Sequence, residues 1–371
     1  MTKRTRLIIL SICAVLFFIL IPFILLYSLG YRIDFENKKI VGTGGIYIRT
    51  IQTPVDITID SKISAKTGRF SPSVFIQNLL PQKHTVLIAK EGYFDYHKNV
   101  EVKEKEVTKL EHVILFKKEI PFAILKNEAQ SPFTEETTQD DYTMKGSALY
   151  YSNSPSNASL SLAAKAMPIV TDIITYKASN GSIIWLASDG FLYKSDANGK
   201  NEEQLSLIAL QINKKSFYEL FVFNQRIFLK ENNGLLLLDT QEKSFQGFYS
   251  PVEGLAASPN SQKLIFYNEH EISYSFLNSP LPEKIFLNRF SEKITAVQWL
   301  NDDYLIFTLG GKIMISELDE NEPNIITLPP TTTINGIAID ITNPEILFSQ
   351  TDKKLYIQTQ TSILVSEELI P

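Results

Sequence analysis

Residues 256–267 read AASPNSQKLIFY, and this stretch is the clearest copy of a pattern that recurs along the chain. A short apolar segment leads into the polar turn Ser258-Pro259-Asn260-Ser261, and a second apolar segment, Leu264-Ile265-Phe266-Tyr267, follows. Short apolar runs bounded by Ser, Pro, Asn and Gly are typical of β-strands joined by tight turns. The stretch therefore predicts two adjacent antiparallel strands.

Six such pairs of apolar segments occur, with turns centred near residues 154, 189, 232, 269, 310 and 351, about 39 residues apart. The pairs are 149–151 with 160–162, 184–186 with 191–193, 227–229 with 235–237, 264–267 with 272–274, 305–307 with 313–315, and 346–348 with 355–357. A further strand candidate precedes five of them, at 173–174, 221–223, 255–257, 296–299 and 337–339. About four short strands in a period near 40 residues are typical of β-propeller blades. Because a single blade cannot bury both of its faces, neighbouring blades must supply the core.

The repeats resemble the TolB-like and WD-repeat propellers. Residues 256–267 match their strand, Ser-Pro-Asn turn and strand, with Ser261 where glycine is usual, and residues 297–299 followed by 304–307 are a second match. The resemblance covers the C-terminal three-fifths of the chain and implies a rigid fold that presents variable loops. We expect six blades. The alternative is seven, the last one assembled from residues 122–125 and 363–365.

An apolar segment near the N-terminus runs from Leu7 to Leu29, and 20 of its 23 residues are apolar. A helix of this length spans about 34 Å, enough to cross a hydrocarbon core of about 30 Å. Lys3, Arg4 and Arg6 precede the segment, whereas acidic residues are mixed with the basic residues that follow it. The positive-inside rule therefore favours a cytoplasmic N-terminus, with everything after residue 31 outside the membrane. The alternative is a cleaved signal peptide, but the apolar core is too long for one and residues 26–31 form a poor cleavage site.

Between residues 46 and 115 the chain changes to short strands without helical periodicity. Residues 55–60 alternate apolar and polar side chains, as a half-buried strand does, and Gly92 lies in a turn where we expect a positive φ. About six strands in seventy residues predict a small β-sandwich. We expect Tyr93 to cover its core. A glycan-binding patch at Tyr93, Phe94, Tyr96 and His97 is the alternative to simple aromatic packing.

This segment resembles the PEGA domain, a small β-sandwich of prokaryotic surface proteins. The matching residues are Thr53-Pro54, Asp60, Ser71-Pro72, Asn78-Leu79-Leu80-Pro81 and Lys90-Glu91-Gly92-Tyr93. The tetrapeptide that names the family is shortened to Pro54-Val55-Asp56, and Ser61 and Gln82 stand where turn glycines are expected. The resemblance implies an accessory role at the cell envelope and brings no catalytic residues with it.

The predicted organisation is an all-β ectodomain on one N-terminal transmembrane helix. Its parts are a cytoplasmic tail at 1–6, the transmembrane helix at 7–29, a juxtamembrane linker at 30–45, a PEGA-like β-sandwich at 46–115, a linker at 116–141, and a β-propeller at 142–371. Part of the second linker, residues 122–125, can still pair as a strand. The net charge of −5 argues against nucleic acid as a partner, and the single cysteine, Cys13, excludes a disulfide scaffold.

The sequence contains no constellation suited to a reaction. It holds four histidines, His84, His97, His112 and His270, and it lacks HExxH, CxxC, GxSxG and Walker motifs. We predict that Gly42-Thr43-Gly44-Gly45 and Asp196-Ala197-Asn198-Gly199 are turns, that Asp302-Asp303 is a solvated turn, and that Trp185 and Trp299 belong to the core. No catalytic residue, cofactor or metal site is expected, and the sequence assigns no ligand-binding residue.

These features predict a non-enzymatic binding or scaffolding protein of the cell envelope, held in the membrane by a single span with its β-propeller outside. The expected partner, besides the membrane, is an envelope protein or a cell-wall or glycan polymer. Two alternatives remain: a propeller-based hydrolase or lyase that acts on envelope polymers, and an extracytoplasmic sensor module. The sensor would need a partner for output, because six residues before the span are too few for a signalling domain.

Overall fold

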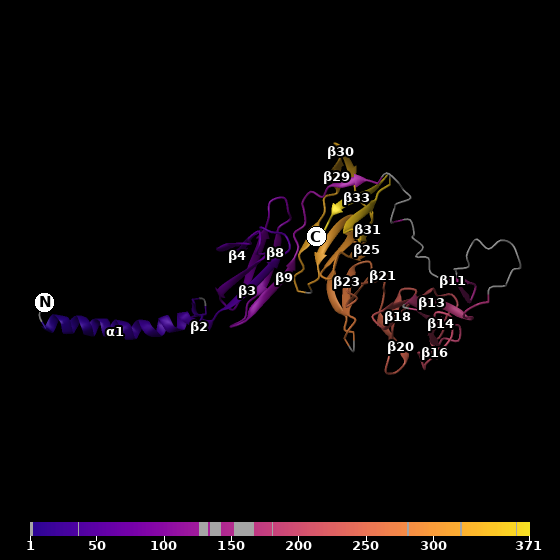
Figure 1. The fold of residues 1–371 in the computed structure, drawn as a ribbon, viewed down its shortest axis with the longest axis horizontal. Coiled ribbons are helices and arrows are strands. Elements are labelled where there is room, and N and C mark those ends of the chain that lie inside the picture. The colour runs from indigo at the N-terminus through magenta and orange to yellow at the C-terminus, as the bar shows by residue number, and fades with distance from the viewer. Residues whose placement is uncertain are drawn as a thin grey trace. The chain divides into compact units, whose positions relative to one another are not determined.

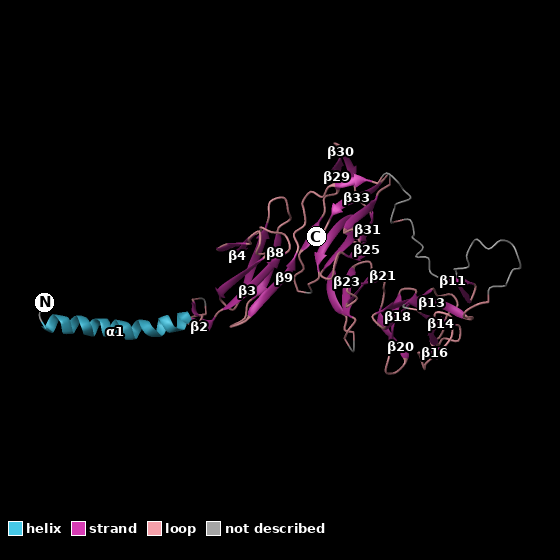
Figure 2. Cartoon of the chain, viewed as in Figure 1, coloured by secondary structure: helices cyan, strands magenta, loops and turns pink. Residues whose placement is uncertain are grey.

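The computed structural model describes residues 3–35, 37–125, 133, 142–151, 167–179, 181–279, 282–319, 321–360 and 362–371. It divides into two compact units. The first comprises Met1–Ile120, Glu322–Ile326 and Leu369–Pro371, and the second comprises Pro121–Asn321 and Thr327–Glu368. Among the described residues one helix precedes a series of small sheets (Figure 2). The all-β class with an N-terminal apolar helix is therefore confirmed.

Helix α1 (Lys3–Ser28) contains the predicted apolar segment. An 18-residue window within its stretch Arg4–Ser28 has a mean hydropathy of 3.1, and no residue of that window is buried against the rest of the protein. An exposed helix this apolar is suited to a hydrocarbon environment, either as a membrane anchor or as a signal sequence. A hairpin of β1 (Tyr31–Asp34) and β2 (Lys39–Gly42) follows directly. The segment 30–45, expected to be a linker, is thus largely ordered, because Ile33 pairs with Ile40 and Val41 is buried.

The predicted β-sandwich is present in the first unit. One sheet has the strand order β6–β3–β9, in which β3 and β9 are parallel, and the other has the order β5–β4–β7–β8. The strands are β3 (Gly44–Thr50), β4 (Asp56–Ile59), β5 (Ile63–Lys66), β6 (Ser73–Leu79), β7 (Lys83–Ala89), β8 (Tyr96–Glu101) and β9 (Val107–Val113). Inward-facing residues such as Ile48, Ile57 and Val86 are fully buried between the sheets and alternate with partly or fully exposed residues.

Four consecutive sheets follow the chain beyond residue 172, each built of four antiparallel strands in sequence order. They are β13 (Ile173–Ser179), β14 (Ser182–Ala187), β15 (Leu192–Asp196) and β16 (Glu203–Gln204); β17 (Tyr218–Phe223), β18 (Arg226–Glu231), β19 (Gly234–Asp239) and β20 (Ser244–Tyr249); β21 (Gly254–Ala257), β22 (Lys263–Tyr267), β23 (Glu271–Phe276) and β24 (Ile285–Arg289); and β25 (Ile294–Trp299), β26 (Tyr304–Leu309), β27 (Lys312–Glu317) and β28 (Ile325–Thr327). The hairpins and preceding strands predicted for these four repeats are all present, so the period of about 39 residues marks propeller-type blades.

The second strand of each sheet explains why the repeats contain apolar runs. On β14, Ile184 and Leu186 pack into the core shared with the next sheet, whereas Ile183 and Trp185 pack into the core on the opposite face. On β18, Phe228 likewise belongs to a different core from its neighbours in sequence. A strand buried on both faces needs apolar residues at successive positions, because alternation would leave one face polar. The apolar triplets therefore come from packing between adjacent sheets.

A fifth four-stranded sheet joins residues distant in sequence, in the order β10–β33–β32–β31. Its strands are β10 (Phe122–Ile124), β31 (Glu345–Ser349), β32 (Lys354–Gln358) and β33 (Ile363–Glu368), and β33 is the yellow C-terminal strand of Figure 1. The two segments proposed for a seventh blade do pair with each other, with Ala123 opposite Val365. However, they complete the sheet of the sixth hairpin and form no blade of their own.

Two hairpins of the second unit lie outside this pattern. β11 (Tyr142–Lys145) pairs with β12 (Ala148–Tyr151), whereas we expected residues 149–151 to pair with 160–162; the latter lie outside the described residues. β30 (Ile337–Asp340) pairs with β29 (Thr331–Ile334), although we predicted that residues 337–339 would be the first strand of the sixth blade. The reason is the turn between them, because Asn335 and Gly336 both have positive φ, as the tightest hairpin turns require.

Candidate binding site

The aromatic residues considered as a glycan-binding patch lie at the start of β8 and in the turn before it. Tyr96 is completely buried in the sandwich core and Tyr93 packs against it, as expected, whereas His97 is exposed. Gly92 has a φ of +79°, as predicted. Because Tyr96 lies in the core and Tyr93 packs against it, these two rings do not form an exposed face together with Phe94 and His97. The structure therefore favours aromatic packing over a glycan-binding patch.

His84 makes the most specific polar contacts of the sandwich. Its ring is 4% exposed, Nδ1 lies 2.6 Å from a carboxylate oxygen of Asp60, and Nε2 lies 2.8 Å from the carbonyl oxygen of Leu80. The other carboxylate oxygen of Asp60 accepts the amide of Thr85 at 2.9 Å. These bonds connect the turn after β4 to the loop before β7. His84 is therefore a buried structural group of the sandwich.

Acidic turns of the second unit also hold the fold together. Lys263 Nζ donates to the carbonyl oxygen of Asp302 at 2.7 Å and contacts the carboxylate of Asp303 at 3.1 Å. The carboxylate of Asp302 accepts the amide of Asn260 at 3.0 Å. Asp302-Asp303 thus connects one sheet to the turn of the previous one, which the prediction of a simple solvated turn missed. The sequence signal for this contact is Lys263, the basic residue that follows the Ser258–Ser261 turn and can reach an acidic turn.

Asp196 closes the turn between β15 and β16. Its carboxylate accepts the amides of Lys200 and Asn198 at 2.8 and 3.0 Å, and the bond from Lys200 is the main reason that the pKa of Asp196 is lowered. The predicted turn is confirmed. Trp185 and Trp299 are buried, with 1% and 4% exposure, and are core residues as expected. In the described part of the chain, no three His, Cys, Asp or Glu side chains gather in a way that could hold a metal ion.

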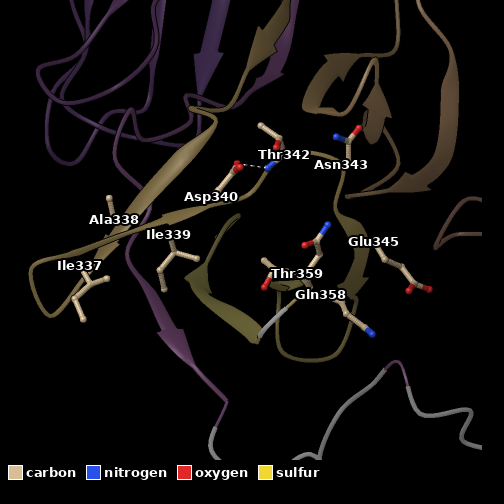
Figure 3. A pocket seen from close by; sticks show the side chains of 10 residues that line it. Ile337, Ala338, Ile339, Asp340, Thr342, Asn343, Glu345, Gln358 and Thr359 are labelled. Atoms are coloured by element: carbon tan, nitrogen blue, oxygen red, sulfur yellow. Dashed lines mark hydrogen bonds between the residues drawn. The ribbon is translucent and has the colours of Figure 1, made fainter.

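A groove of about 620 Å³ in the second unit is the candidate binding site. It lies between hairpin β29–β30, the start of β31 and the end of β32, and Figure 3 shows side chains from these elements around a shared open space. The lining residues are Ile337, Ala338, Ile339, Asp340, Thr342, Asn343, Glu345, Gln358, Thr359 and Gln360. Seven of these ten side chains can make hydrogen bonds, and the lining contains no histidine, cysteine, lysine or arginine.

The groove owes its shape to backbone contacts at its rim. The Asp340 carboxylate accepts the amide of Thr342 at 2.8 Å, and the amide of Asn343 donates to the carbonyl oxygen of Gly311 at 2.7 Å. Glu345 and Gln358 face each other across β31 and β32, so both side chains lie at the open end of this strand pair. The backbone of the loop from β30 to β31 is therefore held in place, with Glu345 and Gln358 at neighbouring positions beside it.

The sequence reasoning did not identify this groove, because its residues are individually ordinary. The available signal was Asn335-Gly336 between a threonine run and the apolar residues Ile337 and Ile339. This is the strongest short-range signal for a hairpin, and it would have removed residues 337–339 from the sixth blade.

The comparison with protein families supports the resemblance of the sandwich to the PEGA domain. The model of the PEGA domain matches residues 43–115. The chain carries a PEGA domain. This domain includes the whole β-sandwich from β3 to β9. No curated protein matches the chain.

Several solved structures share a coarse likeness with between 60% and 88% of this chain. YCF48 from Cyanidioschyzon merolae is 10% identical with a TM-score of 0.39, covering 88% of this chain and 98% of the other. YCF48 bound to D1 peptide is 12% identical with a TM-score of 0.37, covering 87% and 96%. Kluyveromyces lactis Hsv2 is 11% identical with a TM-score of 0.39, covering 60% and 68%. Since these scores are low, the propeller-type assignment depends on the blade sheets themselves.

Proposed function

We propose that this chain is a non-enzymatic binding protein of the cell envelope, anchored by α1 with its PEGA domain and propeller-type unit outside the membrane. The exposed apolar helix supports the anchor, and the basic residues Lys3, Arg4 and Arg6 before it support a cytoplasmic N-terminus. The PEGA domain supports an extracellular β-domain protein of accessory function.

The polar groove is the main observation that supports a binding function. Its amide, hydroxyl and carboxylate groups suit a ligand rich in hydroxyl and amide groups, and its apolar wall at Ile337 and Ile339 suits the C–H face of such a ligand. Asp340 and Glu345 are the ionisable groups of the lining, and their carboxylates can accept hydrogen bonds from ligand hydroxyl groups. We therefore propose a glycan or cell-wall polymer as the partner of this groove.

Binding of purified cell-wall glycan to the full chain in lipid nanodiscs tests this function. N343A and Q358A each remove an amide from the groove, and Q241A removes an exposed amide from the distant turn after β19. We expect both groove variants to weaken glycan binding several-fold, whereas Q241A binds as the unchanged chain does. Equal binding by all variants would refute the groove as the site.

The same samples distinguish binding from turnover. A non-enzymatic protein leaves the polymer intact after prolonged incubation. Release of soluble glycan fragments by the unchanged chain, lost in D340N or E345Q, would contradict the proposal and indicate a hydrolase or lyase that uses the groove carboxylates.

A further inference from the structure

An exposed apolar face lies on hairpin β1–β2, immediately after the apolar helix. Ile33 and Ile40 are cross-strand partners whose side chains are 46% and 52% exposed. Phe35, two residues beyond Ile33, is 82% exposed. On the opposite face Asp34 and Val41 are each 8% exposed. The hairpin therefore buries one face against the first unit and presents isoleucine and phenylalanine on the other, which is costly in water.

The hairpin is firmly joined to the end of α1. The amide and hydroxyl of Thr43 both donate to the carbonyl oxygen of Gly30, at 2.9 and 2.7 Å. The guanidinium of Arg32 donates to the carbonyl oxygen of Tyr27 at 2.9 Å and lies 3.5 Å from the centre of the Tyr27 ring. Figure 1 shows the hairpin at the C-terminal end of the helix. The apolar face is thus held where a membrane-spanning α1 would leave the bilayer.

Two exposed lysines lie close to the apolar residues of the hairpin. Lys38 is exposed in the turn, and Lys39, the first residue of β2 and the cross-strand partner of Asp34, is also exposed. The carboxylate of Asp34 is turned inward and accepts the amide and side chain of Asn37 at 3.1 and 2.8 Å. With Arg32 and Glu36 included, residues 31–42 carry one more positive than negative charge. Apolar side chains beside exposed ammonium groups are typical of segments that lie at the boundary between acyl chains and headgroups.

We infer that hairpin β1–β2 is an interfacial membrane contact, in which Ile33, Phe35 and Ile40 enter the acyl-chain boundary and Lys38 and Lys39 meet anionic lipid headgroups. This inference rests on the proposed function, because it requires α1 to be in the bilayer. A second contact beside the span restricts how the PEGA domain tilts on the membrane, since a single helix end leaves that angle free. The occupant of this face is the lipid surface that surrounds the helix.

Site-directed fluorescence on the full chain in vesicles tests the inference. The natural chain has one cysteine, Cys13, in the apolar helix, so each label needs the replacement of Cys13 and the introduction of one new cysteine. The environment-sensitive dye NBD is attached at F35C or I40C in a C13A background. The vesicles contain phosphatidylcholine and phosphatidylglycerol, with a nitroxide quencher on the acyl chain close to the headgroup. We expect blue-shifted emission and strong nitroxide quenching at both positions.

The matched control is F70C, again in the C13A background. Phe70 is 98% exposed. It lies just before β6, whose first residue Ser73 pairs with Arg49, near the end of β3 farthest from the hairpin. Its label should be quenched several-fold less by the nitroxide and more by aqueous iodide. If labels at residues 35 and 40 respond as the label at residue 70 does, the inference is overturned.

Two further measurements distinguish a failure of the membrane anchor from a failure of the hairpin contact or of its lysines. A label on the native Cys13 is quenched by a nitroxide deep in the bilayer if α1 spans the membrane; loss of this signal refutes the anchor itself, not the hairpin contact alone. In the labelled F35C chain, K38Q together with K39Q should abolish the increase in quenching that added phosphatidylglycerol produces. An unchanged increase would refute the role of the two lysines.

Discussion

Strand β10 gives a sharp test of how the second unit is held together, because it is an edge strand from the N-terminal side of the unit paired with the C-terminal strand β33. Leu125 donates its amide to Ile363 at 2.8 Å, and Glu367 donates to Pro121 at 3.0 Å. Hydrogen-bonded pairs alternate along an antiparallel ladder, so Ala123 and Val365 also form such a pair. The amide of the next residue, Ile124, faces away from β33.

The perturbation is a proline at either of two neighbouring positions. A123P removes an amide that donates to the half-buried Val365 carbonyl, whereas I124P removes an amide on the free side of an edge strand, where proline is tolerated. Removal of this donor leaves the Val365 carbonyl without its partner, which costs about 1–3 kcal/mol. Both variants share the restriction of φ. We therefore expect the free energy of unfolding of A123P to be lower than that of I124P by about 1–3 kcal/mol.

The assay is chemical unfolding of the full chain in detergent micelles, followed by tryptophan fluorescence. The two tryptophans, Trp185 and Trp299, are both buried in the second unit, so the signal reports on that unit. The unfolding midpoint of A123P should fall well below that of I124P. Equal midpoints would show that β10 does not contribute the ladder described here, and a lower midpoint for I124P would show that the register is shifted by one residue.

Three further predictions concern single groups. The free energy of unfolding of G190A should fall by about 1–2 kcal/mol because of its φ of +87°, and by about 1–3 kcal/mol more because a Cβ there would lie 2.1 Å from a backbone oxygen. G181A, with φ +73° and open space around its Cβ, should lose only the first amount in the same unfolding assay. Equal losses in the two variants would contradict the crowding at Gly190. A hydrogen bond to Asp352 and burial raise the pKa of Tyr356 to about 12 from 10.0. The stability that this shift contributes is therefore complete below pH 10 and is lost as the pH rises to about 12. Y356F should abolish this part of the pH dependence of unfolding, and an unchanged pH profile would refute the prediction. H84A removes a buried ring and leaves the partly exposed Asp60 carboxylate and Leu80 carbonyl without this partner, so it should cost the sandwich about 1–3 kcal/mol. The measurement is amide exchange in β4 and β7, which should become faster, whereas unaltered exchange would show that the contacts contribute little.

Local patterns in the sequence were sufficient to find the elements that depend on near neighbours. The apolar run at 7–29 predicts α1, because the period and length of a membrane-crossing helix are visible without any partner. The blade hairpins are visible for a related reason. Strands such as β14 and β18 are buried on both faces, so each contains a continuous apolar run, and glycine or asparagine marks the turns between them.

Contacts between distant segments were only partly visible. The pairing of residues 122–125 with 363–365 was anticipated, but not the sheet that they complete, because an edge strand carries no signal for its neighbour's identity. The groove is a similar case. Asp340, Glu345 and Gln358 are polar residues of ordinary spacing, and only the pairing of β31 with β32 and the hairpin β29–β30 bring them around one space.

The sequence by itself determined the apolar helix, the PEGA domain and the period of the blades, because burial on one or both faces of a strand dictates which positions are apolar. The tertiary structure alone decided three things. It assigned β10 to the last sheet, it turned residues 30–45 into a hairpin with an apolar outer face, and it assembled the polar groove. The physical reason is that hydrogen bonds and packing between segments far apart in the chain are selected by the whole fold, and their residues look the same in sequence whether or not they meet.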